Sequence, residues 1–208
     1  MKIVFFGDSI TDAGRDRIGM FARLGAGYVS HVGFNLEGND PKKYTVINLG
    51  IGGNRCVDLY ARMHKVWNQK PDVLSILVGV NDVWHYLKDG NQGIDIERYE
   101  SVYRLILRDT KKRFPNIKLV VMEPFFLDGT ATTAHKDLLK MVYDYARVAK
   151  KIAEEEGAIF LPLQEKLSSL ADKIGDFNVL FDGVHPNISG AKLIADEWLK
   201  VFREKIEG

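Results

Sequence analysis

The sequence has one cysteine, no long apolar run and no excess of charge of either sign, and each absence excludes a class of protein. Cys56 has no cysteine partner, so neither an internal disulfide nor a cysteine-based zinc site can form, which suits a reducing compartment. No stretch approaches the ~20 apolar residues that a membrane helix needs. The 29 Lys and Arg nearly balance the 28 Asp and Glu, and a formal charge of +1 gives no general attraction to nucleic acid or to anionic membranes.

A secretion signal is also missing from the start of the sequence. The segment Met1 to Asp8 has an apolar run that is too short for a signal peptide, and no small-residue cleavage site follows it. Unless an export signal was removed from the chain, we expect a cytoplasmic protein that acts on small neutral substrates and has no nucleic-acid or membrane partner. The sequence leaves the oligomeric state open, and a homo-oligomer is compatible with it.

The length and the apolar pattern predict a single α/β domain over residues 1–208, because 46% of the residues are hydrophobic and can form a substantial core. Short runs rich in β-branched residues predict five strands, at 2–6, 44–49, 73–78, 118–122 and 158–161. Apolar residues at helical spacing predict helices at about 27–37, 55–69, 95–114, 134–156 and 188–206. This alternation predicts a three-layer α/β/α sandwich, in which helices cover both faces of a five-stranded parallel sheet.

Residues with notable chemistry follow the predicted strands. Ligands of such sheets bind beyond the carboxyl ends of the strands, so the residues just after each strand deserve inspection. The first three strands lead into a serine at Ser9, a glycine-rich segment at 48–54 and an asparagine at Asn81. Close to the C-terminus, Asp182 lies three residues before His185.

Four segments resemble, in this order, the conserved blocks of the GDSL/SGNH hydrolases: GDSITD at 7–12, NLGIGGN at 48–54, GVND at 79–82 and DGVHP at 182–186. Each block alone arises often by chance, but the ordered set spans nearly the whole chain. The resemblance implies the flavodoxin-like SGNH hydrolase fold, with Ser9 as nucleophile and with Asp182 and His185 completing a catalytic triad. It also implies an oxyanion hole made by the Ser9 amide, Gly53 and Asn81.

The chemistry of these residue types agrees with the implied roles. A serine hydroxyl is a weak nucleophile, so a neutral imidazole has to accept its proton during attack on an ester carbonyl, and His185 suits that task. A carboxylate three residues earlier, Asp182, can reach the other ring nitrogen and stabilise the imidazolium. Two backbone N–H groups and the Asn81 amide would stabilise the charge that develops on the carbonyl oxygen. This chemistry requires no metal and no organic cofactor.

Each of these residues also has a purely structural interpretation. Ser9 could cap a helix or form a turn, and Asp182 with His185 could pair and cap the last helix. Gly53 could serve a tight turn, and Asn81 could bond to the backbone as many loop asparagines do. The constellation of four segments, rather than any member, favours the catalytic interpretation.

Longer stretches, at 7–15, 24–29 and 79–84, resemble one branch of the family, the intracellular acetylxylan esterases that deacetylate xylo-oligosaccharides. The chain departs from the typical second block, Ser-Gly-Asn-Thr, in having Gly-Gly-Asn-Arg at 52–55, which keeps the oxyanion glycine and changes the adjacent pocket wall. The resemblance implies a small-molecule ester as substrate, an acetylated xylo-oligosaccharide or a related carbohydrate, hydrolysed through an acyl-enzyme.

Arg55 and Trp84 are candidate substrate-binding residues because they lie next to these blocks in sequence. Trp84 would offer an aromatic face to a sugar ring, and its alternative is ordinary core packing. The enzymatic alternative is a lysophospholipase or thioesterase that acts on longer acyl chains, although the sequence shows no extra apolar lid. The non-enzymatic alternative is a catalytically silent carbohydrate-binding module, against which the intact triad argues.

Overall fold

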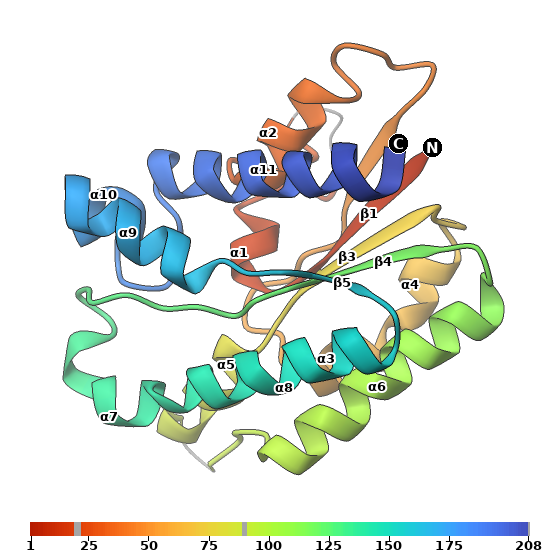
Figure 1. Cartoon of the computed structure of the whole chain (residues 1–208). Coiled ribbons are helices and arrows are strands. Elements are labelled where there is room, and N and C mark those ends of the chain that lie inside the picture. The colour runs from red at the N-terminus through yellow and green to blue at the C-terminus, as the bar shows by residue number, and fades with distance from the viewer. Residues whose placement is uncertain (19–21, 89–90, 208) are drawn as a thin grey trace.

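The computed structural model describes residues 1–18, 22–88 and 91–207 of the chain. All five predicted strands are present, and they form one parallel sheet with the order β2-β1-β3-β4-β5 (Figure 1). The strands are β1 (Lys2–Gly7), β2 (Thr45–Asn48), β3 (Val73–Leu77), β4 (Lys118–Met122) and β5 (Ile159–Leu161). The predicted α/β architecture is therefore confirmed.

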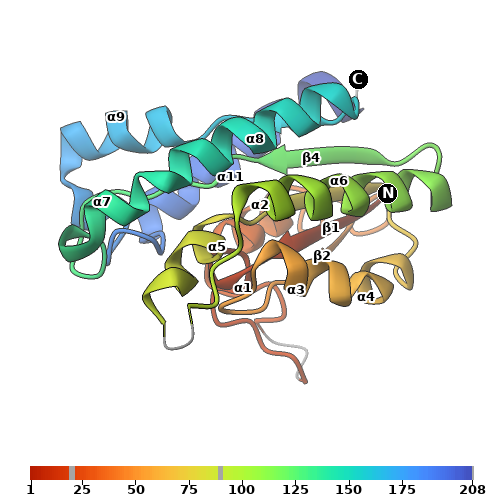
Figure 2. The same ribbon diagram turned by 90° about the horizontal axis from the view of Figure 1, so that it is seen from below.

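Helices cover both faces of this sheet. On one face, α2 (Tyr28–Asn35) packs against α11 (Ile188–Phe202), and on the other lie α6 (Ile96–Arg113) and α8 (Met141–Glu155), as Figures 1 and 2 show. Every residue of β3 is buried, and β1 is buried from Ile3 onward. Strands that are covered on both faces are apolar along their whole length, which explains the continuous apolar runs of the sequence.

Trp198 connects the last helix to the sheet. Its ring lies against Phe5 of β1 with a centroid distance of 4.9 Å and against Phe202 at 5.2 Å. Its Nε1 donates a hydrogen bond to the Ser75 hydroxyl of β3 at 3.0 Å, so the polar end of this buried ring is satisfied. One side chain therefore links α11 to the two strands at the centre of the sheet.

The remaining described α-helices have 4 to 11 residues. They are α1 (Ser9–Asp12), α3 (Cys56–Ala61), α4 (Met63–Trp67), α5 (Val80–Trp84), α7 (Lys136–Leu139), α9 (Gln164–Ile174) and α10 (Asp176–Val179), with the 3₁₀-helices η1 (His85–Leu87) and η2 (Thr133–His135) and the π-helix η3 (Arg203–Glu207). None of the helices in the described ranges is long and apolar enough to cross a membrane.

Two predicted helices are interrupted, and α1, α5, α9 and α10 were not predicted. The helix expected at 55–69 is divided into α3 and α4 at Arg62, whose φ of −116° and ψ of 19° are not helical. The helix expected at 134–156 is divided at Lys140, where the dihedral angles remain helical. The periodicity misses α9 because only Leu167 and Ala171 of this polar segment are buried.

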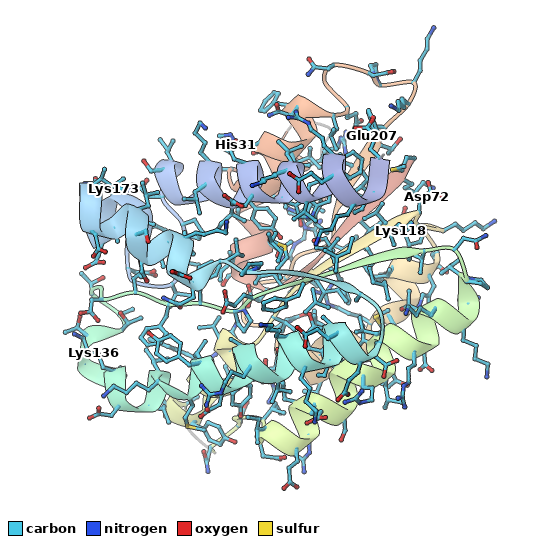
Figure 3. The ribbon with its side chains drawn as sticks, viewed as in Figure 1. His31, Asp72, Lys118, Lys136, Lys173 and Glu207 are labelled. Atoms are coloured by element: carbon cyan, nitrogen blue, oxygen red, sulfur yellow. The ribbon has the colours of Figure 1, made fainter. Side chains whose placement is uncertain are left out.

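The order of the strands places the functional segments together. The chain passes from β1 to β2 on one side and then to β3 on the other, so the sheet reverses its direction of growth at β1. Such a switch point leaves a crevice at the carboxyl ends of the strands, where Ser9 follows β1 and Asn81 follows β3. Asp72 and Lys118 lie at the opposite edge, where β3 and β4 begin (Figure 3).

The end of β1 accepts only a glycine. A Cβ added to Gly7 would lie 2.4 Å from the Leu77 carbonyl oxygen and 2.4 Å from the Thr11 hydroxyl. We expect Gly7→Ala to lower the free energy of unfolding by about 1–3 kcal/mol, because the backbone of a central strand cannot move aside. Urea unfolding would measure the change. Gly52→Ala, whose added Cβ has its nearest neighbour at 3.8 Å, is the control and should change stability by less than about 0.5 kcal/mol.

Candidate active site

Ser9 begins helix α1 immediately after β1. Asp8 occupies the N-cap position, and its Oδ1 accepts a hydrogen bond from the Ile10 amide at 2.9 Å. The helix ends after one turn at Ala13, whose φ of 44° is left-handed and whose N–H donates to the Ser9 carbonyl. This short turn holds the Ser9 hydroxyl at the carboxyl end of the sheet.

His185 and Asp182 lie in the turn before α11 and reach Ser9 across the switch point. Nε2 of His185 lies 2.8 Å from the Ser9 Oγ, and Nδ1 lies 2.7 Å from Oδ2 of Asp182. The other carboxylate oxygen, Oδ1, accepts hydrogen bonds from the Val184 and His185 amides at 2.9 and 2.8 Å. The three side chains that the sequence singles out as a triad therefore form one continuous line of hydrogen bonds.

The Asp182 carboxylate is stabilised in its charged form. Burial raises its pKa, but the two backbone amides and the His185 ring outweigh that effect, and the pKa lies below its ordinary value. A carboxylate that stays ionised keeps the proton of the imidazole on Nδ1, so the lone pair of Nε2 faces Ser9.

The turn that carries this pair is fixed by close backbone packing. Gly183 has a φ of 95°, and a Cβ there would lie 2.2 Å from the Thr132 hydroxyl. Its carbonyl accepts a hydrogen bond from the Leu127 amide at 2.8 Å. The position thus needs glycine for both conformation and space, and the turn is held against the segment that follows β4.

The predicted oxyanion residues lie on the loops after β2 and β3. Gly53 has a left-handed φ of 78°, and a Cβ added to its neighbour Gly52 would lie 3.8 Å from the Ser9 Cβ, so this loop approaches the nucleophile. Asn81, in the first turn of α5, donates from Nδ2 to the Asn54 carbonyl at 3.3 Å. The Asn81 side chain also lies close enough to the buried Asp8 carboxyl to lower the pKa of that group.

The two predicted substrate-binding residues have protein partners. Arg55 forms a two-pronged ion pair with Asp58, with distances of 2.8 and 3.1 Å, and donates to the Gln92 carbonyl at 2.7 Å. Trp84 packs against the core and edge-on to His135, with ring centroids 6.1 Å apart. Neither lines the cavity at Ser9. Their contact with a substrate stays a prediction.

A cavity of about 360 Å³ opens beside Ser9 and His185. Its walls come from α1 and the residues after it, from the start of α2, and from the turn before α11: Ile10, Ala13, Gly14, Ala26, Gly27, Phe181 and Pro186. Phe181 is 45% exposed and stacks on the His185 ring with a centroid distance of 5.7 Å and an interplanar angle of 20°. The sequence analysis missed Phe181, although its position next to Asp182 was a signal.

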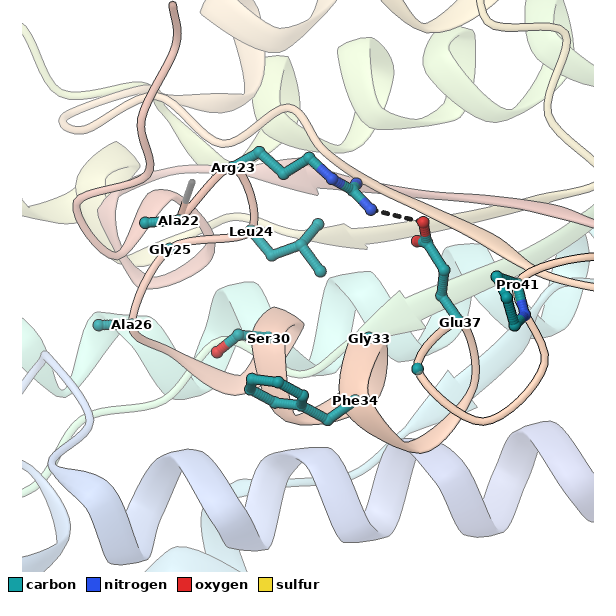
Figure 4. Close-up of a pocket in the computed structure, with 11 residues that line it drawn as sticks. Ala22, Arg23, Leu24, Gly25, Ala26, Ser30, Gly33, Phe34, Glu37 and Pro41 are labelled. Carbon is teal, nitrogen blue, oxygen red and sulfur yellow. Dashed lines mark hydrogen bonds and ion pairs between the residues drawn. The ribbon is translucent and has the colours of Figure 1, made fainter. Parts of the chain in front are cut away.

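A second cavity, of about 780 Å³, lies farther along α2 and shares Ala26 with the first. Figure 4 shows it between the segment 22–26 and α2, with Leu24 and Phe34 on opposite sides. Arg23 and Glu37 form an ion pair of 2.5 Å at its wall. The surface next to the first cavity is therefore hollowed beyond Ala26.

Two further kinds of chemistry would need a metal ion or a reactive thiol at this site. Within the described part of the chain, no three His, Cys, Asp or Glu side chains are grouped so that they could hold a metal ion. Cys56 is buried at the start of α3, and burial raises the pKa of its thiol well above the ordinary value. A thiol in that state is a poor nucleophile.

Asp8, next to the nucleophile, is fully buried. Burial raises the pKa of its carboxyl to about 6, although the Ile10 amide and the nearby His185 oppose that rise. Its Oδ2 has no hydrogen-bond partner among the residues that the structure describes. The residue therefore caps α1 at an electrostatic cost whenever it is ionised.

The sequence is similar to that of known esterases. It matches the GDSL-like Lipase/Acylhydrolase family over residues 5–193. An acetylxylan esterase of Geobacillus stearothermophilus is 35% identical over 211 residues, which cover 96% of this chain and 92% of the esterase. A GDSL esterase/lipase of Arabidopsis thaliana is 25% identical over 223 residues, which cover 98% of this chain and 86% of the plant protein.

Solved structures share the fold. The crystal structure of the Geobacillus acetylxylan esterase matches with a TM-score of 0.83 and 34% identity, over 96% of this chain and 92% of that one. A Parabacteroides merdae protein assigned to the GDSL-like lipases matches with a TM-score of 0.88 and 37% identity, over 96% and 94%. Catalytic mutants of the Geobacillus esterase carry alanine in place of a serine, an aspartate and a histidine three positions after that aspartate.

The raised pKa of Asp8 predicts a specific effect on stability. Its pKa is 3.8 in the unfolded chain and about 6 in the folded protein, so the folded state binds the proton more tightly and stability falls as the pH rises from 4 to 7. Asn also caps helices, so Asp8→Asn should remove this loss and stabilise the protein by up to about 3 kcal/mol at pH 7.5. At pH 4 the two proteins should differ little. Urea unfolding at both pH values would measure this, and an equal difference at both would contradict the assignment.

Proposed function

The chain belongs to the GDSL-like lipase/acylhydrolase family and is a carboxylic ester hydrolase, and we propose that Ser9, His185 and Asp182 are its catalytic triad. One observation carries the proposal: the distance from Ser9 Oγ to His185 Nε2 is 2.8 Å and that from Nδ1 to Asp182 is 2.7 Å. Both distances are short enough for proton transfer or a strong hydrogen bond. The spacing of the aspartate and the histidine in the catalytic mutants of the Geobacillus relative also supports it.

In the first half of the proposed reaction, Ser9 Oγ attacks the ester carbonyl carbon while Nε2 of His185 accepts the hydroxyl proton. The imidazolium that results is stabilised by the ionised Asp182. It then donates its proton to the leaving alkoxide as the tetrahedral intermediate collapses. An acyl group remains as an ester on Ser9.

In the second half, water takes the place of the alcohol. His185 accepts a proton from the water, the oxygen attacks the acyl carbonyl, and Ser9 leaves with the proton returned by the ring. In both halves the carbonyl oxygen becomes negatively charged, and we assign its stabilisation to the amides of Ser9 and Gly53 and the side chain of Asn81. The approach of the Gly52 backbone to Ser9 supports this assignment.

For the substrate, we propose a short acyl group, acetyl, on a xylo-oligosaccharide or related carbohydrate. The Geobacillus relative is an acetylxylan esterase, which supports this class. The leaving alcohol has to lie near His185, which protonates it, and that is the side on which the cavity carries the half-exposed Phe181. An aromatic ring at that point provides a flat apolar surface on which one face of a sugar can pack.

A longer acyl chain is the second candidate, and one feature favours it. The cavity of about 780 Å³ continues from Ala26 past Leu24 and Phe34, and this surface has room for an alkyl chain. The charged Arg23–Glu37 ion pair in the wall of this cavity favours a substrate with hydroxyl groups, such as a sugar, over an alkyl chain. We therefore place the acetylated carbohydrate first.

We further propose that residues 1–208 form a single domain, since one sheet organises the elements from β1 to β5 and α11 packs back onto β1 through Trp198.

Replacement of the proposed nucleophile should abolish turnover. We expect Ser9→Ala to reduce kcat on 4-nitrophenyl acetate by at least about 10⁴-fold, because the covalent step has no other acceptor within reach. Ser101→Ala, on the exposed surface of α6, is the control and should be fully active. A serine-directed phosphonate should label Ser9 in the wild type and in the control. Labelling at another serine, or full activity of Ser9→Ala, would refute the triad.

The acyl preference distinguishes the two substrate classes. We expect kcat/KM on 4-nitrophenyl acetate to exceed that on the octanoate by at least about tenfold, and acetate release from acetylated xylo-oligosaccharides to exceed hydrolysis of lysolecithin. The physical reason is the limited cavity of about 360 Å³ at Ser9. A preference for octanoate and lysolecithin would favour the lysophospholipase alternative.

A further inference from the structure

Arg62 lies at the break between α3 and α4 and points toward the carboxyl end of the sheet. Its Nε donates to Oδ1 of Asn54 at 2.6 Å, its Nη1 to the Leu49 carbonyl at 2.6 Å and its Nη2 to the Gly7 carbonyl at 2.9 Å. The guanidinium lies over the Phe6 ring, 4.3 Å from the centroid. A single side chain thus uses donors on all three of its nitrogens.

The three acceptors belong to the segments that carry the catalytic groups. Gly7 lies two residues before Ser9, and Leu49 is the first residue after β2. Asn54 directly follows Gly53, and its own carbonyl accepts the hydrogen bond from Nδ2 of Asn81 at 3.3 Å. Arg62 is therefore bonded to the nucleophile segment and to the oxyanion loop, and it reaches the Asn81 amide through one intervening residue.

All three bonded oxygens are uncharged, which is unusual for an arginine within a fold. Burial lowers the pKa of Arg62 to about 10, so the side chain is still protonated at neutral pH. Among the described residues, no carboxylate bonds to Arg62, although the charges of Asp58 and Asp12 act on it, and the three oxygens replace hydration that burial removes. That arrangement suits a role in holding loops better than a role in charge pairing.

We propose that Arg62 is a positioning residue for the oxyanion hole. The proposal rests on the proposed function. By fixing Asn54, Arg62 orients the carbonyl that accepts a hydrogen bond from the Asn81 amide, and it thereby holds the amide that is proposed to stabilise the oxyanion. Through Leu49 and Gly7 it also fixes the distance between the glycine loop and the nucleophile. The donors are then in place before the charge appears, which is the condition for efficient transition-state stabilisation.

A lysine cannot substitute for this fork. Its ammonium is a single point with tetrahedral donors, whereas the guanidinium presents five N–H groups in one plane, which reach two backbone carbonyls and one side-chain amide oxygen at once. Arg62→Lys would keep the charge and lose the geometry. Arg62→Met would keep most of the apolar stem over Phe6 and lose every donor.

The test is a double-mutant cycle with the amide that Arg62 is proposed to orient. The four proteins are the wild type, Arg62→Met, Asn81→Ala and the double variant, assayed on 4-nitrophenyl acetate. Rates are divided by the concentration of sites that a phosphonate titrates, which removes any effect of misfolded protein. Arg104→Met, which removes a guanidinium that pairs with glutamates on α6 and α8, is the matched control and should be fully active.

We expect Arg62→Met to lower kcat by about 10- to 100-fold with KM changed by less than about threefold, because transition-state contacts are lost and ground-state contacts are not. In the Asn81→Ala background, Arg62→Met should lower kcat by less than about threefold further, since the amide that Arg62 orients is already gone. Arg62→Lys should recover only part of the activity. A boronic acid, which forms a tetrahedral adduct on serine, should bind Arg62→Met more weakly in proportion to the loss of kcat.

Three results would overturn the proposal: full activity of Arg62→Met, a rise in KM with kcat unchanged, or effects of the two replacements that simply multiply. If Arg62→Met does not fold, Arg62→Lys takes its place in the cycle under the same criteria. Failure of the proposed function is distinguishable, because it would appear as an inactive wild type or an active Ser9→Ala, and either would overturn both proposals. An active wild type with multiplicative effects would refute the role of Arg62 alone.

Discussion

The hydrogen bond between the Ser9 hydroxyl and the His185 ring joins residues 176 positions apart in the sequence, and the rest of the site depends on it. Ser9 is carried by β1, and His185 by the turn before α11, so neither segment holds the distance by itself. The core holds it, because Trp198 of α11 packs against Phe5 of β1. A shift of about 1 Å between the first strand and the last helix would be enough to impair the chemistry. The geometry at Ser9 therefore depends on the packing of Trp198 against Phe5 in the core.

The polar groups of the site are organised in two different ways. Asp182 and His185 come from one tight turn, whose amides also bind the carboxylate, so their mutual geometry is local. The proposed oxyanion donors come from three separate loops, and their geometry is assembled from distant parts of the chain. These loops need a residue that contacts more than one of them. Arg62 donates hydrogen bonds to Gly7 at the end of β1 and to Leu49 directly after β2.

The sequence predicted the sheet and its flanking helices, because these follow from apolar periodicity. The pairing of Ser9 with His185 was implied by the resemblance to the GDSL/SGNH hydrolases and not by periodicity. The broken helix at Arg62 was not predicted, since the apolar pattern continues on both sides of it. Phe181 was missed for a related reason: its stack on His185 depends on the bridge between Leu180 and Pro186, which no local pattern indicates. Arg55 and Trp84 were placed by proximity in sequence, and the structure gives both of them protein partners instead of a place in the cavity.

The order of the catalytic groups along the polypeptide has a consequence for its biosynthesis. Ser9 leaves the ribosome well before Asp182 and His185, because His185 lies 176 positions after it. The nascent chain therefore carries an unactivated hydroxyl until α11 can dock onto β1. With the proposed triad, ester cleavage requires both β1 and the turn before α11, and a polypeptide cut in the loops between the sheet and α11 would regain it only through reassociation of both fragments.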